Sequence, residues 1–252
     1  IVLMLTLSGR ATAAAARLEL VRNGASDYCI VIANDTRPVV SNAAGVLQEH
    51  LQKVTGVTLP IETLGGGAEL PAKAILVGEG PLVKKAGVDL SAEKLKYDGF
   101  VVRLAGDRLV LTGALERGPL YAVIDFLERE VGCRWFSKQR VIIPQKKDLS
   151  VRVASRREEP AFEIRMPWGI DMWFAASRVT YTAPQWGKNP FRSDGNAHTF
   201  FMDAPAAVHF KDHPNWYSYH NNGVWFHKTG QLNYHNPDLI KHVRCKKLDA
   251  FK

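Results

Sequence analysis

The chain has 252 residues, of which 46% are hydrophobic and 23% are charged. This length and composition suit one large or two ordinary globular domains with an apolar core, and they exclude a disordered or fibrous protein. The formal net charge is +8. Because the lysines and arginines are scattered and no nucleic-acid-binding motif accompanies them, we expect no nucleic-acid partner.

The N-terminal residues resemble a secretory leader. Ile1–Leu7 is apolar and leads through Ser8 and Gly9 into the alanine-rich stretch Ala13–Ala16. An apolar run followed by small residues is typical of a signal peptide, and this one is too short to span a bilayer. An ordinary first strand is the alternative, although alanine runs suit strands poorly. We therefore predict a signal peptide remnant, export to the periplasm or the extracellular space, and no stable membrane insertion after cleavage.

The next segment alternates between strand and helix signals. The predicted strands are Tyr28–Ala33, Val57–Ile61, Ala74–Val77, Phe100–Leu104 and Leu109–Leu111. A helix begins after Asp35 and Thr36, with Pro38 in its first turn, and ends at Gly56. Gly106-Asp107 suits a tight hairpin between the last two strands. This order predicts an α/β domain with a mixed sheet.

The run from Arg108 to Phe136 combines a strand, a turn, an amphipathic helix and a second strand. The first strand ends at Thr112-Gly113, and Pro119 lies where a first helical turn begins. One helix face carries the apolar residues Leu120, Ile124, Leu127 and Val131. Gly132 is the expected helix end, and β-prone residues follow it.

This run resembles the small α/β domain that precedes the catalytic barrel in bacterial α-glucuronidases of glycoside hydrolase family 67, and the corresponding domain of β-hexosaminidases. The resembling residues are Gly113, Arg117-Gly118, Tyr121–Val123, Asp125–Glu128 and Gly132–Phe136. From about Leu18 to His242, the chain also resembles bacterial proteins that carry the domain of unknown function 4838. The resemblance implies an accessory α/β domain followed by a glycosidase-type (β/α)8 barrel.

Composition changes after the charged, proline-terminated stretch Arg156–Pro160, which is typical of a linker. Five of the six tryptophans lie from Trp168 onward, and seven of the eight histidines lie between His198 and His242. Aromatic planes stack on sugar rings and imidazoles bind hydroxyl groups, so this composition favours a carbohydrate cleft. Ordinary burial in a core is the alternative. We predict Trp168, Trp216 and His198 as substrate-binding residues.

The resemblance to the unknown-function group supports His198, which lies in the motif Asn196–Phe200. In such barrels, the loop after the first strand contributes to the site. The chain departs from the group's pattern at Asn215, where an acid is expected, and at Asn233, where a cysteine is expected.

The sequence gives little indication of a metal site or of a reactive thiol. His209 and His213 are four residues apart, but Pro205 and Pro214 flank this pair closely and no glutamate follows His209. We therefore expect no metal and no cofactor. The chain has no CxxC pair, and Cys29 and Cys133 are predicted to be buried packing residues.

The chain lacks a recognisable catalytic pair. Glycoside hydrolysis usually needs two carboxyl groups, yet no glutamate follows Glu163 and the later aspartates form no recognisable acid–base pair. No GxSxG motif occurs either. An eight-stranded barrel needs about 250 residues, far more than follow the linker. We therefore expect a chain truncated inside the barrel, with unknown catalytic residues.

Together these features predict three parts: a signal peptide remnant at 1–16, an α/β domain at 17–155 and the start of a barrel at 156–252. The fold class is α/β, with a mixed-sheet accessory domain followed by the first elements of an incomplete (β/α)8 barrel. By resemblance, full-length relatives are α-glucuronidase-like enzymes of polysaccharide metabolism, which act on or bind uronic-acid or amino-sugar polysaccharides. The alternatives are a non-catalytic carbohydrate-binding or scaffold module and a metal-dependent enzyme. Carbohydrate is the expected partner, and the basic charge favours an acidic polysaccharide.

Overall fold

The computed structural model describes residues 16–114, 116–137, 139–165, 176–180, 186, 200–218 and 232–250. The chain forms two compact units, residues 1–190 and 191–252. Of the predicted signal peptide, only Ala16 lies within the described residues. Trp168 and His198 lie outside them.

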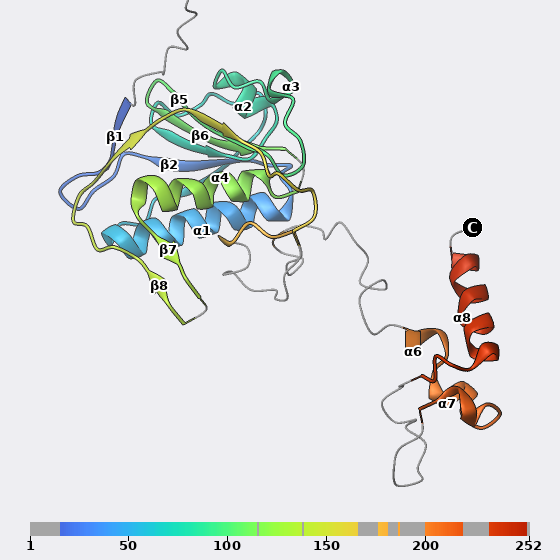
Figure 1. Cartoon of the computed structure of the whole chain (residues 1–252). Helices are drawn as coiled ribbons and strands as arrows, with labels where there is room; N and C mark the ends of the chain where they lie inside the picture. Colours follow the sequence, from blue (N-terminus) through green and yellow to red (C-terminus); the bar gives the residue numbers. More distant parts are fainter. Residues whose placement is uncertain are drawn as a thin grey trace, which may run out of the picture. The chain divides into compact units, whose positions relative to one another are not determined.

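The first unit is built on a six-stranded mixed sheet with the strand order β10-β5-β6-β4-β2-β3 (Figure 1). Its strands are β2 (Cys29–Ala33), β3 (Ile61–Leu64), β4 (Ala74–Val77), β5 (Phe100–Ala105), β6 (Arg108–Gly113) and β10 (Arg156–Glu158). Strands β3, β2, β4 and β6 are parallel, whereas β5 runs antiparallel to both β6 and β10. The predicted mixed sheet is confirmed.

Two smaller antiparallel pairs complete this unit. Strand β1 (Ala16–Val21) pairs with β9 (Leu149–Val153). Strand β7 (Arg134–Trp135) pairs with β8 (Val141–Ile142) in a hairpin. Phe136, beside this hairpin, is exposed.

Helices cover both faces of the central sheet (Figure 1). On one face lie α1 (Pro38–Thr55) and α4 (Gly118–Phe126), which continues as a π-helical turn at Leu127–Val131. On the other lie α2 (Pro81–Lys85) and α3 (Leu90–Glu93). Successive side chains of a strand point to opposite faces. Ile30 and Ile32 of β2 therefore pack with α1 and α4, while Val31 packs with α2.

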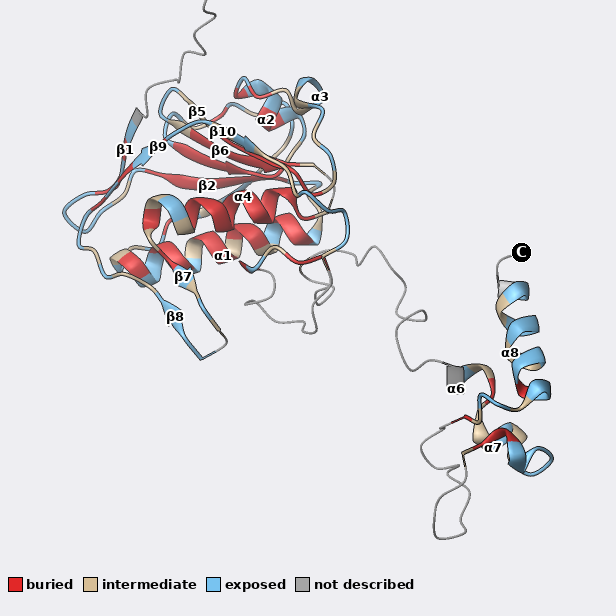
Figure 2. Cartoon of the chain, in the orientation of Figure 1, coloured by how far each residue is buried: buried red, intermediate tan, exposed pale blue. Residues whose placement is uncertain are grey.

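Burial follows from this layering. Figure 2 shows the central strands, α4 and part of α1 as buried. Cys29 and Cys133 are both buried free thiols, which confirms their predicted packing role. Loss of water around the thiols raises the pKa of each to about 11, so both stay protonated at neutral pH.

The two long helices begin and end close to where the sequence predicts. Pro38 opens α1, and Gly56 ends it with a left-handed backbone, φ 78°. Pro119 lies in the first turn of α4, and Gly132 follows the π-helical turn with φ 99°. The backbone N–H groups of Gly132 and Cys133 both donate to the carbonyl of Leu127, at 2.9 Å each. These bonds widen the last turn.

Two predictions about strands and linkers are wrong. The strand predicted at Val57–Ile61 begins only at Ile61. Leu59 is nevertheless fully buried, and its carbonyl accepts a hydrogen bond from the Gln48 side chain at 2.7 Å. Burial without strand pairing thus explains the apolar character of this stretch.

The second difference concerns Arg156–Pro160, predicted as a linker. Arg156–Glu158 instead forms the edge strand β10, paired with Phe100–Val102. The side chain of Arg156, the first residue of β10, is held in place by ion pairs with Asp125 and Glu130. The charges that suggested a solvated linker are therefore partners of other charges within the unit.

Three backbone segments meet at the start of α4. A Cβ atom added to Gly118 would lie 2.6 Å from the carbonyl oxygen of Gly99 and 2.7 Å from the carbonyl carbon of Gly113. Such distances are shorter than van der Waals contact, and the neighbours are backbone atoms. Only glycine fits there, which gives the Arg117-Gly118 motif a structural reason.

The described part of the second unit is helical. It contains α6 (Phe200–Asp203), α7 (Ala206–His209), a 3₁₀ turn at Pro214–Trp216 and α8 (Pro237–Ala250). Its small core consists of Ala204, Trp216, Tyr217, Leu232 and Leu239. An isolated bridge joins Tyr217 to Leu232. The first elements of a (β/α)8 barrel stay a prediction.

None of the helices in the described ranges is long and apolar enough to cross a membrane.

Candidate functional site

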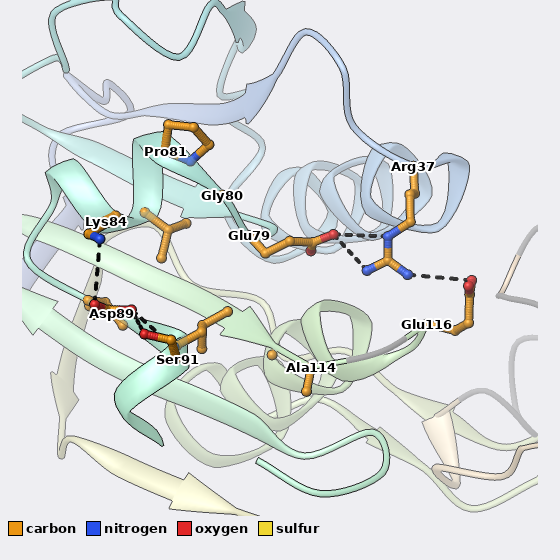
Figure 3. A pocket seen from close by; sticks show the side chains of 13 residues that line it. Arg37, Glu79, Gly80, Pro81, Lys84, Asp89, Ser91, Ala114 and Glu116 are labelled. Carbon is orange, nitrogen blue, oxygen red and sulfur yellow. Dashed lines mark hydrogen bonds and ion pairs between the residues drawn. The ribbon is translucent and has the colours of Figure 1, made fainter. Parts of the chain in front are cut away.

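A pocket of about 670 Å³ opens where β4 and β6 end (Figure 3). Its volume lies within the usual range of sites for small molecules. The residues that line it come from the loops and short helices after the strands: Arg37, Glu79, Gly80, Pro81, Val83, Lys84, Val88, Asp89, Leu90, Ser91, Gly113, Ala114 and Glu116. We call it the strand-end pocket.

The order of the strands explains why a pocket forms here. Strand β2 leads into α1 on one face of the sheet, whereas its neighbour β4 leads into α2 on the other. Where the connections of adjacent parallel strands leave to opposite faces, a crevice opens outside their carboxyl ends, and ligands of α/β proteins bind there. Arg37 follows β2 and Glu79 follows β4, so the two residues flank this crevice.

Arg37 joins the loops that follow three strands. Its Nε and Nη2 atoms lie 2.9 and 2.7 Å from Oε1 of Glu79. Its Nη1 atom lies 3.5 Å from Oε2 of Glu116. The planar guanidinium presents donors in several directions, so one arginine can contact both carboxylates (Figure 3). About one-third of each of these side chains is exposed, which leaves the group open to a ligand.

The opposite rim carries a second charged pair. Lys84 Nζ lies 3.7 Å from Asp89 Oδ2. The other oxygen of Asp89 accepts hydrogen bonds from the hydroxyl group and the backbone N–H of Ser91, at 2.7 and 3.0 Å. The hydroxyl contact is the main reason that the pKa of Asp89 is lowered, so this carboxylate is ionised at neutral pH.

The pocket also has an aliphatic wall, made of Pro81, Val83, Val88 and Leu90. Among the described residues that line the pocket, none is aromatic. The pocket therefore offers hydrogen-bonding groups beside aliphatic carbon, without a ring on which a ligand could stack.

Glycines shape the turn from β4 into α2. Gly80 has φ 97° and ψ −158°, a backbone region that is essentially restricted to glycine. Gly78 has φ 117°, and a Cβ atom there would lie 2.9 Å from Cγ1 of Val40. This turn places Glu79 within reach of Arg37.

A second charged cluster surrounds Asp125 on α4. The Asp125 side chain is fully buried, and three arginines contact it. Arg129 Nε and Arg178 Nη2 both lie 3.0 Å from Oδ1, and Arg156 Nε lies 2.5 Å from Oδ2. Arg156 also binds both carboxylate oxygens of Glu130, at 2.7 and 3.0 Å. The cluster fixes β10 and the segment around Arg178 to α4.

Tyr121 and Asp98 hold the same part of the chain. The Tyr121 hydroxyl donates to the carbonyl of Val179 at 2.7 Å, and burial raises the pKa of this tyrosine to about 12. Arg165 Nη2 lies 3.0 Å from Asp98 Oδ2. The motif residues Tyr121 and Asp125 thus anchor the chain that follows the sheet, which is a structural role.

Of the three predicted substrate-binding residues, the structure describes Trp216. It is only 5% exposed, and the His213 ring stacks on it at 4.1 Å between centroids with planes 10° apart. The rings of His209 and His242 lie 5.5 and 5.0 Å away. No cluster that could hold a metal occurs within the described ranges. The roles of Trp216, Trp168 and His198 in carbohydrate binding stay predictions.

No family model and no curated protein matches the chain. Among solved structures, one similar chain is "a novel family GH115 4-O-methyl-alpha-glucuronidase, BtGH115A, with specificity for decorated arabinogalactans". It is 23% identical, with a TM-score of 0.41, and the similarity covers 59% of this chain and 19% of that one. Another is CpGH84D, 15% identical, with a TM-score of 0.35, covering 61% of this chain and 24% of that one. The chain thus spans less than a quarter of either.

Sequence reasoning missed the strand-end pocket. Arg37, Glu79 and Glu116 are ordinary charged residues, far apart in the chain. The available signal was their position, since each follows the end of a predicted strand or the turn after it, and parallel strands end at one edge of a sheet. Strand order was needed to turn this signal into a site.

Proposed function

We propose that the chain is part of a glycoside hydrolase-related protein and that its first unit binds carbohydrate in the strand-end pocket. The observation that carries this proposal is a pocket that combines charged side chains with an aliphatic wall. The pocket lies where the neighbouring strands β2 and β4 lead into helices on opposite faces of the sheet. A sugar ring has the matching chemistry, because its hydroxyl groups donate and accept hydrogen bonds while its C–H groups contact aliphatic carbon. The resemblance of residues 108–136 to α-glucuronidase accessory domains supports it.

For this unit we propose carbohydrate binding and not cleavage of a glycosidic bond. A glycosidase pair needs space for a sugar or a water molecule between its two carboxyl groups. In the strand-end pocket, Arg37 contacts both Glu79 and Glu116 and occupies the position between them. These two carboxylates therefore suit recognition. Hydrolysis of α-glucuronide-like linkages belongs, on this proposal, to relatives that carry a complete catalytic barrel.

Export is part of the same proposal. Its support is the apolar run Ile1–Leu7 followed by the small residues Ala13–Ala16. An exported protein would meet polysaccharides outside the cytoplasm.

The binding proposal is tested by ligand-observed NMR of the full chain with glucose, glucosamine and glucuronate as separate probes. At least one sugar should bind, and Ser91→Trp should weaken its binding about tenfold or more by filling the mouth of the pocket. Ala92→Trp is the matched control, because Ala92 is exposed on the same helix but does not line the pocket. Absence of binding by all three sugars, or equal binding by the Ser91→Trp chain, would contradict the proposal.

A further inference from the structure

The charges that line the strand-end pocket do not balance. Three carboxylates, Glu79, Asp89 and Glu116, face two cations, Arg37 and Lys84. The lining therefore carries one more negative than positive charge, although the whole chain carries a net charge of +8. The net charge of the pocket lining is therefore opposite in sign to the net charge of the whole chain.

Both cations already have partners. Arg37 binds Glu79 through two nitrogen atoms, at 2.7 and 2.9 Å, and Lys84 lies 3.7 Å from Asp89. Glu116 has the longer contact with Arg37, at 3.5 Å. Of the two carboxylates that contact Arg37, Glu116 is therefore the less tightly paired, and about one-third of its side chain is exposed.

A ligand carboxylate fits this lining poorly. To pair with Arg37 or Lys84, it would have to displace an existing carboxylate partner and leave that oxygen without its ion pair. It would also approach the excess negative charge at short range. The pocket thus disfavours a uronate, although the basic charge of the chain as a whole suggested acidic polysaccharides.

We propose that the strand-end pocket selects a sugar ring without negative charge and prefers an amino sugar, whose protonated amine pairs with Glu116. This inference rests on the proposed carbohydrate binding and narrows it to a substrate class. The ring hydroxyls donate to Asp89 or Glu79 and accept from Arg37 or Lys84. The aliphatic wall contacts the C–H face of the ring.

The test uses the full chain with glucosamine, glucose and glucuronate in low salt at mildly acidic pH, where the amine is protonated. Titrations by NMR should rank glucosamine about two- to fivefold tighter than glucose, the fold-change that a partly exposed ion pair supports. Glucuronate should bind more weakly than glucose. Added salt should reduce the preference for glucosamine.

Glu116→Gln should bring the affinities of glucosamine and glucose to within about twofold of each other. Glu69→Gln is the matched control, because the Glu69 side chain is 95% exposed and lies outside the pocket lining. Tightest binding of glucuronate, or a preference that survives Glu116→Gln, would overturn this inference and leave the proposed function standing. Failure of all three sugars to bind would instead overturn the proposed function.

Discussion

Asp125 shows how one buried charge can organise a unit. Its carboxylate is fully buried, yet it contacts three arginines that come from the π-helical turn after α4, from β10 and from the segment around Arg178. Burying a charge costs free energy unless partners compensate for it, and here the partners are the chain segments that must be held. Loss of this one charge should therefore loosen several contacts together.

Asp125→Asn keeps the shape of the side chain and removes its charge. We expect the free energy of unfolding to fall by about 1.5–3 kcal/mol, because the mostly buried Arg156 and the partly exposed Arg129 and Arg178 lose a charged hydrogen-bond acceptor. Urea denaturation followed by circular dichroism measures the change. Arg129→Gln should cost less than about 1 kcal/mol, since the Arg129 side chain is 52% exposed. Equal costs for the two variants would contradict the role given to Asp125.

His50 gives the first unit a dependence on pH. Only 6% of this residue is exposed, its Nδ1 lies 2.8 Å from the carbonyl of Val46, and its ring lies 5.3 Å from that of Trp135. Burial lowers the pKa of His50, because the charged imidazole loses water. The folded state thus prefers the neutral ring.

The lowered pKa of His50 sets the direction in which the free energy of unfolding changes with pH. The contribution of neutral His50 is complete above the pKa of an unfolded histidine, about 6.5, and is lost as the pH falls below that value. His50→Gln cannot titrate, so its free energy of unfolding should fall less steeply between pH 7.5 and pH 5 than that of the original chain. His235→Gln, at an exposed position, should keep the original slope. An unchanged slope in His50→Gln would refute this account.

At the scale of elements, the contact between β5, β6 and α4 depends on glycine. Gly118→Ala would place a methyl group 2.6 Å from the carbonyl oxygen of Gly99. We expect a loss of about 1–3 kcal/mol or a failure to fold, because backbone must move to relieve the overlap. Gly45→Ala is the control, since nothing lies within 4 Å of its added Cβ on α1.

The control should gain stability. Alanine is favoured over glycine in a helix interior by about 0.5–1 kcal/mol. Thermal unfolding of both variants therefore separates steric overlap from helix propensity. If Gly118→Ala matched Gly45→Ala, the close approach at the start of α4 would be wrong.

Elements that depend on local signals were predictable from the sequence. Pro38 and Gly56 bound α1, and Pro119 and Gly132 bound the second long helix, because these residues act on their own backbone. Elements that depend on distant partners were not. Strand β10 exists because it pairs with β5, more than 50 residues earlier in the chain, and no local pattern records that pairing.

The candidate site also depends on contacts between residues that are distant in the sequence. Arg37 and Glu79 are 42 residues apart, and each reads by itself as a solvated surface charge. Their contact depends on β2 and β4 being neighbours in the sheet. The sequence alone could not decide whether Trp216 packs or binds a ligand, because that depends on neighbours such as His213 and His242.

At the scale of the whole molecule, the chain combines two units of different character. The first has a layered α/β core, and its carboxyl-end crevice carries the candidate site. The second has a small core in which Trp216 is surrounded by three histidine rings. The proposed carbohydrate binding concerns the first unit alone.

The most direct test of this account is a crystal structure of the full chain grown with glucosamine. We expect a sugar ring in the strand-end pocket, with its amine beside Glu116 and its C–H face on the wall that contains Pro81 and Leu90. An empty pocket with glucosamine bound elsewhere on the chain would contradict the proposal that the crevice beyond β4 and β6 is a carbohydrate site.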